Sequence, residues 1–314
     1  MRTCSRKIPP KFLEREKRAM WASALPVHSR SRPNSTTKYI VAHQDHISTS
    51  SPTATNEWPS IMGALKPPIQ RETHRALEGI LKEHSKVVIK LTVQNNGILA
   101  DSVSQSIYKE YRITEELRGI PGFIRPYCYF ECEDSYTKVL VLPFFEEGSM
   151  RSCNWTKKPF ALLHACLLQC IGSLFQAYDT KGILHSDTHL DNVLLKKTTI
   201  GEVEYTFGGH IIRVPTEGYM IAIMDFEMSM SEVPTNRGQA IGQLYDDVLH
   251  AVFDLRYNDS SDIVGDTELI TTLMTLKAHP GDVYTAWQTL YPLVLKVKAI
   301  PKVSRSFTYD PFAF

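Results

Sequence analysis

The sequence GILHSDTHLDNVLLKK, residues 182–197, brings two histidines and two aspartates into seven consecutive positions. His185 and His189 have the four-residue spacing at which two imidazoles bind zinc when both lie on one helix. Here Gly182 indicates the end of a helix, and the apolar run after Asn192 is typical of a strand. The two histidines are therefore expected in a loop, where this spacing does not favour a zinc site.

The same loop carries the polar residues that phosphoryl transfer requires. Asp187 and Asn192 stand five positions apart, and Asp225 ends the next strongly apolar strand. One carboxylate can orient a substrate hydroxyl and accept its proton, while an amide and a second carboxylate can hold magnesium on the phosphates of ATP. The pattern H-x-D-x-x-x-x-N, followed by a strand and Asp-Phe, resembles the protein-kinase superfamily.

A buried ion pair is expected upstream of this loop. Lys90 ends the apolar sequence VVIK, which resembles the V-A-I-K motif of kinases, and a helix is expected at residues 104–119. Glu110 falls on the apolar face of that helix, where a carboxylate requires a cation. In the kinase pattern Lys90 is that cation, and the pair holds the α and β phosphates. Glu115 and Glu116 are the competing carboxylates.

The resemblance also assigns the residues around the adenine base. The sequence VLVLPFFEEGSM resembles the segment that joins the two lobes of a kinase. It implies that Leu142 lines the adenine pocket and that the backbone of Pro143, Phe144 and Phe145 pairs with the base edge.

Three further residues take supporting roles by the same resemblance. His185 would brace the backbone of the catalytic loop, and His189 would stand near the transferred phosphate. The sequence GQLYDDVLHAVFDL resembles the large buried helix of the second lobe. Asp247 flanks its apolar stripe and would brace the loop, whereas Asp246 points away.

Within the superfamily, the likeness is to the haspin kinases and to the serine/threonine kinases of large DNA viruses. They share a histidine two residues after the catalytic aspartate, here His189, where most kinases have lysine. They also share a hairpin-like insert before the metal-binding strand, here followed by VPTEGYMIAIMD. The resemblance covers roughly residues 75–255. It implies a serine/threonine protein kinase that uses ATP and Mg²⁺ and acts on a protein substrate.

Several positions depart from the kinase pattern. The glycine-rich loop G-x-G-x-x-G is missing before Lys90, which favours a pseudokinase acting as an interaction module. Glu227 follows Asp-Phe where protein kinases have glycine, and this triplet also resembles the choline and aminoglycoside kinases, which act on small molecules. Ser186 replaces the arginine that reads a phosphorylated activation loop, and the segment from Asp225 to Asp247 is short. Control by loop phosphorylation is therefore not expected.

The elements alternate in type, which predicts an α+β protein with two kinase-like lobes. We expect strands at 86–93, 135–144 and 219–225, a helix from Pro159 to Gly182, a hairpin turning at Gly208 and Gly209, and a mainly helical part from Gly238. Residues 59–143 would form the small β-rich lobe and residues 144–314 the larger helical lobe. Residues 1–58, basic at first and then rich in serine and threonine, are expected to be a mostly disordered tail.

Composition and charge bound the partners and the location. The chain has 314 residues, 43% of them hydrophobic, and a formal net charge of +1, so it offers no electrostatic argument for nucleic acid or a membrane. The basic N-terminus could dock a partner, although a solvated tail is the simpler interpretation. Because it also lacks the apolar core of a signal peptide, we expect an intracellular protein, in the cytoplasm or nucleus, or in a host cell if it is viral.

Two cysteine pairs have the spacing CxxxC, Cys128 with Cys132 and Cys166 with Cys170. Zinc is one interpretation of such a spacing. The second pair, however, lies among leucines on the apolar face of a predicted helix. Buried free thiols are favoured, because free cysteine is among the most buried residue types.

Overall fold

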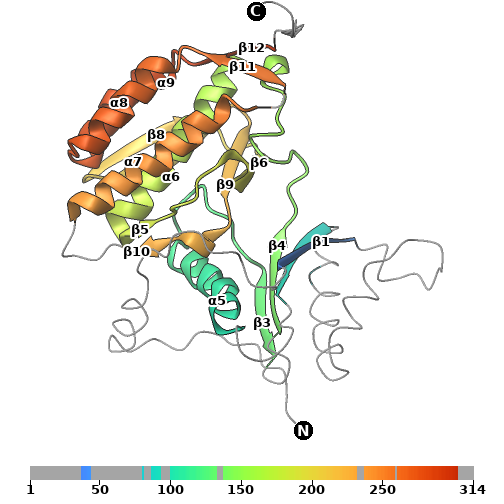
Figure 1. Cartoon of the computed structure of the whole chain (residues 1–314). Helices are drawn as coiled ribbons and strands as arrows, with labels where there is room; N and C mark the ends of the chain where they lie inside the picture. The colour runs from blue at the N-terminus through green and yellow to red at the C-terminus, as the bar shows by residue number, and fades with distance from the viewer. Residues whose placement is uncertain are drawn as a thin grey trace, which may run out of the picture. The chain divides into compact units, whose positions relative to one another are not determined.

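The structure, a computed structural model of the full chain, describes residues 37–43, 80, 86–92, 100–132, 137–231, 237–258 and 260–302. The chain divides into two compact units, the first made of residues 1–112 and 125–144 and the second of residues 113–124 and 145–314. Helices and strands are both present (Figure 1), so the predicted mixture of α and β structure is confirmed. The kinase-like two-lobed arrangement stays a prediction.

The first unit contains one antiparallel sheet with the strand order β1-β2-β4-β3. Its strands are β1 (Thr37–His43), β2 (Lys86–Thr92), β3 (Cys128–Cys132) and β4 (Thr137–Pro143). Valine and other apolar residues suited to a pleated, half-buried surface fill β2 and β4. These two strands agree with the strands expected at 86–93 and 135–144.

Strand β1 falls within residues 1–58, where the composition predicts a mostly disordered tail. Its sequence TKYIVAH contains Thr, Tyr, Ile and Val, residues that favour a strand, and it pairs with β2 along its whole length. The average composition of the segment conceals this short run. The rest of the predicted tail lies outside the described residues.

Helix α5 (Ala100–Glu116) contacts the sheet through Tyr108 and Tyr111, whose rings both lie against that of Tyr129 in β3. The register places Lys90 opposite Leu140 and Leu140 opposite Tyr129, so these three side chains share one face. The ring of Tyr111 stacks on that of Tyr129, with 5.1 Å between their centroids. Contacts on this face fix the rotation of α5 about its axis.

The second unit is centred on α6 (Phe160–Lys181), which is buried along most of its length. It begins after Pro159 and ends at Gly182, whose φ of 62° is the left-handed value of a helix C-cap. Both ends agree with the sequence. Among the described residues, α6 is the one helix long and apolar enough to cross a membrane, but 78% of its most apolar window is buried inside the protein, as in a core helix.

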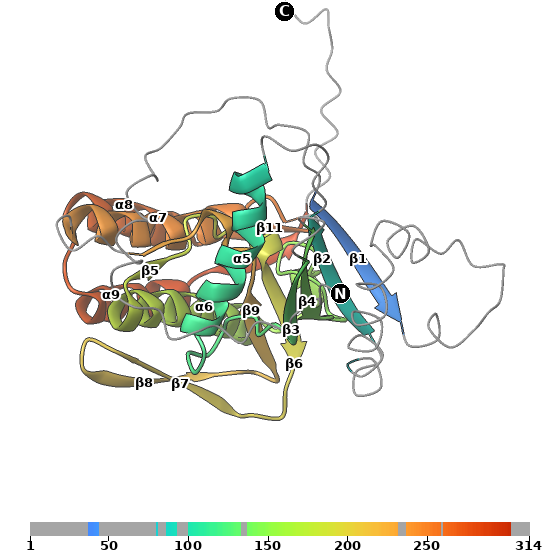
Figure 2. The ribbon, with the colours of Figure 1, turned by 90° about the horizontal axis from the view of Figure 1, so that it is seen from below.

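In the described part of this unit, three more helices contribute to the core, α7 (Arg237–Leu255), α8 (Thr267–Ala278) and α9 (Val283–Val294). The hairpin of β7 (Glu202–Phe207) and β8 (His210–Pro215) runs beside α6 (Figure 2). Gly208 and Gly209 turn it with φ of 56° and 75°, as predicted. At its contact with α6, a Cβ on Gly172 would lie only 2.9 Å from Cδ2 of Tyr205, so a glycine is required there.

Short strand pairs and 3-10 turns connect these elements. The pairs are β5 (Ile183–Leu184) with β10 (Met230–Ser231), β6 (Val193–Lys197) with β9 (Tyr219–Ile223), and β11 (Ser261–Val264) with β12 (Lys298–Pro301). The turns are η1 (Trp155–Lys157), η2 (Leu190–Asn192) and η3 (Phe226–Met228). Strands β11 and β12 interrupt the mainly helical part that is expected from Gly238. A strand of four residues is too short for its alternation of apolar and polar residues to be distinguished from the end of a helix.

Four of the cysteines, Cys128, Cys153, Cys166 and Cys170, are free and buried. Burial raises the pKa of the Cys170 thiol to about 12, so it stays protonated at neutral pH. The described residues contain no group of three or more His, Cys, Asp or Glu placed to bind a metal. The interpretation of Cys166 and Cys170 as buried thiols is confirmed, and the side chain of Cys132 lies outside the described residues.

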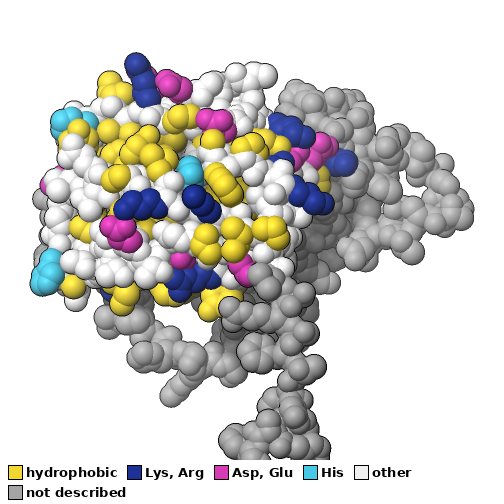
Figure 3. Space-filling model, turned by 90° about the horizontal axis from the view of Figure 1, so that it is seen from above, with side chains coloured by type: hydrophobic (Ala, Val, Ile, Leu, Met, Phe, Trp, Pro, Cys, Tyr) yellow, Lys and Arg dark blue, Asp and Glu magenta, His cyan; other side chains and the backbone are white. Residues whose placement is uncertain are grey.

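Positive and negative side chains are interspersed with apolar groups on the face shown in Figure 3. Lys296 and Glu268 form one exposed ion pair of the second unit, with 2.7 Å between Nζ and Oε2. A mixed surface agrees with the formal net charge of +1.

Asn258, three residues after the end of α7, helps to hold this unit together. Its side chain is fully buried, donates to the carbonyls of Arg151 and Cys153, and accepts from Ser260 and Ser261. Because Asn258→Ala leaves these buried partners unsatisfied, we expect the free energy of unfolding to fall by about 3 kcal/mol. Urea unfolding would measure the loss. As a control, Gln288→Ala removes an exposed amide side chain and should change the free energy of unfolding by less than about 0.5 kcal/mol. An equal loss in the two variants would show that the buried hydrogen bonds of Asn258 do not stabilise this unit.

Candidate active site

The residues of the opening motif lie in a loop of the second unit, between β5 and β6. The two histidines have different surroundings there. His185 is buried and its Nε2 donates to the carbonyl of Met224 at 2.9 Å, whereas 38% of the His189 side chain is exposed. The expectation that they do not form a zinc pair agrees with this geometry.

Helix α7 fixes the start of the loop through one buried carboxylate. Oδ2 of Asp247 accepts the backbone N–H groups of His185 at 3.1 Å and Ser186 at 3.0 Å. Ser186 has a φ of 63°, a left-handed backbone that costs a non-glycine residue about 1 kcal/mol or more. The two hydrogen bonds to Asp247 compensate for this strain. Asp246 instead forms a surface ion pair with Lys277.

Burial dominates the electrostatics around this contact. It raises the pKa of Asp247 to about 7, against the lowering effect of the backbone hydrogen bonds from Ser186 and His185. Burial also lowers the pKa of His185 to about 4. His185 is therefore neutral at pH 7, with its proton on the nitrogen that faces Met224. It acts as a fixed hydrogen-bond donor in the loop.

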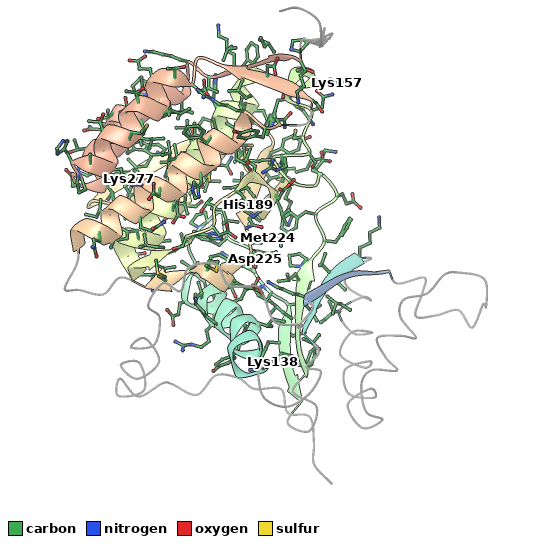
Figure 4. The ribbon with its side chains drawn as sticks, in the orientation of Figure 1. Lys138, Lys157, His189, Met224, Asp225 and Lys277 are labelled. Atoms are coloured by element: carbon green, nitrogen blue, oxygen red, sulfur yellow. The ribbon has the colours of Figure 1, made fainter. Side chains whose placement is uncertain are left out.

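Asn192 and Asp225 lie at the same end of the β6–β9 ribbon. The register pairs Val193 with Ile223, and Met224 donates its N–H to the carbonyl of Asn192 at 2.9 Å. Figure 4 shows His189, Met224 and Asp225 near this end. Asp225 then turns the chain with a left-handed φ of 69°. The sequence separates these two residues widely, and strand pairing brings them together.

The side chains at this end suit magnesium. Nδ2 of Asn192 donates to the carbonyl of Asp187 at 3.1 Å. This bond uses the donor end of the amide, and the carbonyl end is the kind of oxygen that Mg²⁺ accepts as a ligand, together with a carboxylate such as that of Asp225. Two protein ligands are typical of a metal that arrives with nucleotide phosphates. The residues present therefore fit the metal predicted from the sequence.

Asp187, the predicted base, lies at the centre of the loop with 44% of its side chain exposed. Its Oδ2 is 3.8 Å from Nε2 of His189, and Nδ1 of the same ring is 3.8 Å from Oδ2 of Asp191. The loop thus presents a carboxylate to solvent beside an imidazole. This is an arrangement that can receive a hydroxyl group.

Lys90 and Glu110 form a fully buried ion pair in the first unit, with 2.6 Å between Nζ and Oε2. The two competing carboxylates lie in other surroundings: Glu115 pairs with Arg118, and Glu116 is exposed. The choice of Glu110 from the apolar stripe is correct. The role of the pair in holding phosphates stays a prediction.

The residues predicted around adenine lie at and after the end of β4. Leu142 is buried, while Pro143, Phe144 and Phe145 are partly exposed. The ring of Phe144 faces Nζ of Lys86 at 5.3 Å. Their contact with the adenine base stays a prediction.

Two buried contacts near the loop have no clear signal in the sequence. Ser229 is fully buried and its hydroxyl donates to the carbonyl of His185 at 3.0 Å. Phe226 packs its ring 4.9 Å from that of His185. In the sequence, Ser229 is an ordinary serine in a short segment, and Phe226 is noticeable only as part of the Asp-Phe motif. Their partners follow from the pairing of β5 with β10.

The comparisons with known proteins indicate a kinase-like relationship for part of the chain. Relatives of this part include the serine/threonine-protein kinase haspin of Bos taurus, 36% identical over 90 residues, and that of Mus musculus, 38% identical over 72 residues. These matches cover 28% and 23% of this chain, and only 12% and 10% of the relatives. No protein-family model matches the chain.

The raised pKa of Asp247 predicts a pH dependence of stability. The folded carboxyl binds its proton up to about pH 7, whereas the unfolded one loses it near its ordinary value of 3.8. The contribution of Asp247 to the free energy of unfolding should therefore fall as pH rises from 4 to 7, by at most about 1.4 kcal/mol per pH unit. Asp247→Asn keeps an acceptor for the two N–H groups and removes this slope.

Urea unfolding between pH 4.5 and 8 would measure the difference between the native protein and Asp247→Asn. The variant Asp246→Asn, at the neighbouring position, should shift the pH profile much less, because the charge of Asp246 is a minor cause of the raised pKa. Parallel profiles for the native protein and Asp247→Asn would contradict the raised pKa.

Proposed function

We propose that this protein is an ATP- and Mg²⁺-dependent serine/threonine protein kinase with two kinase-like lobes, residues 59–143 and 144–314. The observation that carries the proposal is the loop. Asp187 is partly exposed at its centre, Asn192 is bonded to its backbone, and Asp225 ends the strand paired with it. The partial similarity to haspin supports the same reaction.

The residues of the chain divide the work of the reaction. ATP supplies the phosphoryl group, and Mg²⁺ neutralises its charge. Asp187 orients the acceptor hydroxyl and accepts its proton, while Asn192 and Asp225 hold the metal. Lys90, fixed by Glu110, holds the phosphates. Neutral His185 keeps the carbonyl of Met224, and so the start of the Asp225 turn, in place.

The acceptor is a serine or threonine of a protein substrate, and the protein acts inside a cell. The principal alternative is a small-molecule kinase of the choline or aminoglycoside type, which Glu227 after Asp-Phe favours. A pseudokinase is the second alternative, favoured by the missing glycine-rich loop. Transfer of radiolabelled γ-phosphate to a panel of proteins, and to choline and aminoglycosides, would separate the three.

Removal of the proposed base tests the mechanism. Asp187→Asn should lower turnover at least about a hundredfold, because a general base contributes about that factor or more. ATP binding, measured by magnesium-dependent thermal stabilisation, should persist. The exposed surface variant Glu268→Gln is the control and should keep full turnover. Retained turnover in Asp187→Asn would remove Asp187 from the mechanism.

The buried ion pair allows stability and nucleotide binding to be tested apart. Lys90→Met leaves the Glu110 carboxylate buried without its cation and should lower the free energy of unfolding by about 3–5 kcal/mol. The double variant Lys90→Met/Glu110→Met replaces both charges and should recover most of this loss. Neither variant should be stabilised by ATP with Mg²⁺. Normal ATP stabilisation of the double variant would show that Lys90 does not bind nucleotide.

A further inference from the structure

Helix α7 holds the catalytic loop at a second point, seven residues beyond Asp247. Oδ2 of Asp254 accepts the backbone N–H of Leu190 at 2.7 Å. Seven residues are about two helical turns, so Asp247 and Asp254 share one face of α7, about 10 Å apart along its axis. The helix thus contacts the loop before Asp187, at His185 and Ser186, and again after it.

Arg151 balances the charge at this second point. Its Nη2 lies 2.5 Å from both carboxylate oxygens of Asp254, and only 14% of the Asp254 side chain is exposed. Nε of the same guanidinium is 2.7 Å from Oδ2 of Asp191 in the loop. This second contact is an ion pair without the alignment of a hydrogen bond. One arginine therefore joins the helix carboxylate to the loop carboxylate.

The backbone of Arg151 is itself fixed. Buried Asn258 donates to its carbonyl at 2.6 Å, and the preceding Met150 donates its N–H to Val193, the first residue of β6, at 2.8 Å. A side chain that starts from such a backbone loses less conformational freedom when it pairs. This distinguishes the pair from an exposed surface ion pair, which contributes little.

We propose that Asp254 and Arg151 form a second anchor of the catalytic loop. This proposal rests on the proposed phosphotransfer, which makes the loop catalytic. They are positioning residues. Asp254 fixes the backbone at Leu190, two residues before the metal ligand Asn192. Arg151 fixes Asp191, whose carboxylate faces His189, and the other nitrogen of that ring faces Asp187. The second anchor therefore sets the metal-binding side of the loop, while Asp247 sets its start.

Hydrogen–deuterium exchange of the full chain, read by mass spectrometry on peptides that cover residues 184–195, tests the anchor without requiring activity. Asp254→Leu removes the acceptor of the Leu190 N–H, so exchange there should become at least about tenfold faster. The double variant Asp254→Asn/Arg151→Met keeps a neutral acceptor and removes the opposing charge, and it should retain most of the protection. Asp246→Leu, an equal substitution at the surface of α7, should leave this peptide unchanged.

Kinetics then test the positioning role. In Asp254→Leu, kcat should fall roughly ten- to hundredfold, because displacement of a catalytic group by about 1 Å has that effect. The KM for ATP should change less than kcat. The double variant should recover most of kcat, and Asp246→Leu should keep the native value.

The outcomes are distinguishable. Unchanged exchange at residues 184–195 in Asp254→Leu would overturn the proposal. So would faster exchange spread evenly over α6 and α7, since that marks a purely structural role. If the native chain transfers no phosphate but Asp254→Leu still exposes the Leu190 amide, the proposed function fails and the anchor stands.

Discussion

A buried carboxylate that accepts two backbone N–H groups determines the form of the candidate site. Asp247 can accept from His185 and Ser186 only because α7 packs on α6 and carries this side chain into the interior. Burial disfavours its charge and raises its pKa to about 7. The two hydrogen bonds to Asp247 nevertheless stabilise the left-handed backbone of Ser186, directly before Asp187. The position of Asp187, the proposed base, thus depends on a buried residue of another element.

The proposed metal ligands reach their place by another route. No hydrogen bond between Asn192 and Asp225 is needed, because the register of β6 with β9 sets both at one end of a two-stranded ribbon. The backbone bond from Met224 to Asn192 then holds the ribbon closed at that end. Strand pairing thus positions the proposed metal ligands, whereas a helix side chain positions the proposed base.

The sequence predicts what depends on local pattern, and misses what depends on tertiary pairing. Gly182 ends α6 as expected, and the apolar stripe selects Glu110 as the partner of Lys90. Strand β1 is hidden in a segment of misleading composition, and β11 and β12 are too short to show a period. Asp254 is the instructive case. A spacing of seven residues from Asp247 is visible, but nothing in the sequence says that this face of α7 meets the loop or that Arg151 lies there.

The spacing of the two carboxylates on α7 also constrains how this chain can vary in length. Inserting or deleting one residue between Asp247 and Asp254 would turn one carboxylate by about 100° around the helix relative to the other and shift it by about 1.5 Å. Either carboxylate would then lose its part of the loop. Among descendants of this sequence, this stretch of helix should therefore keep its residue count.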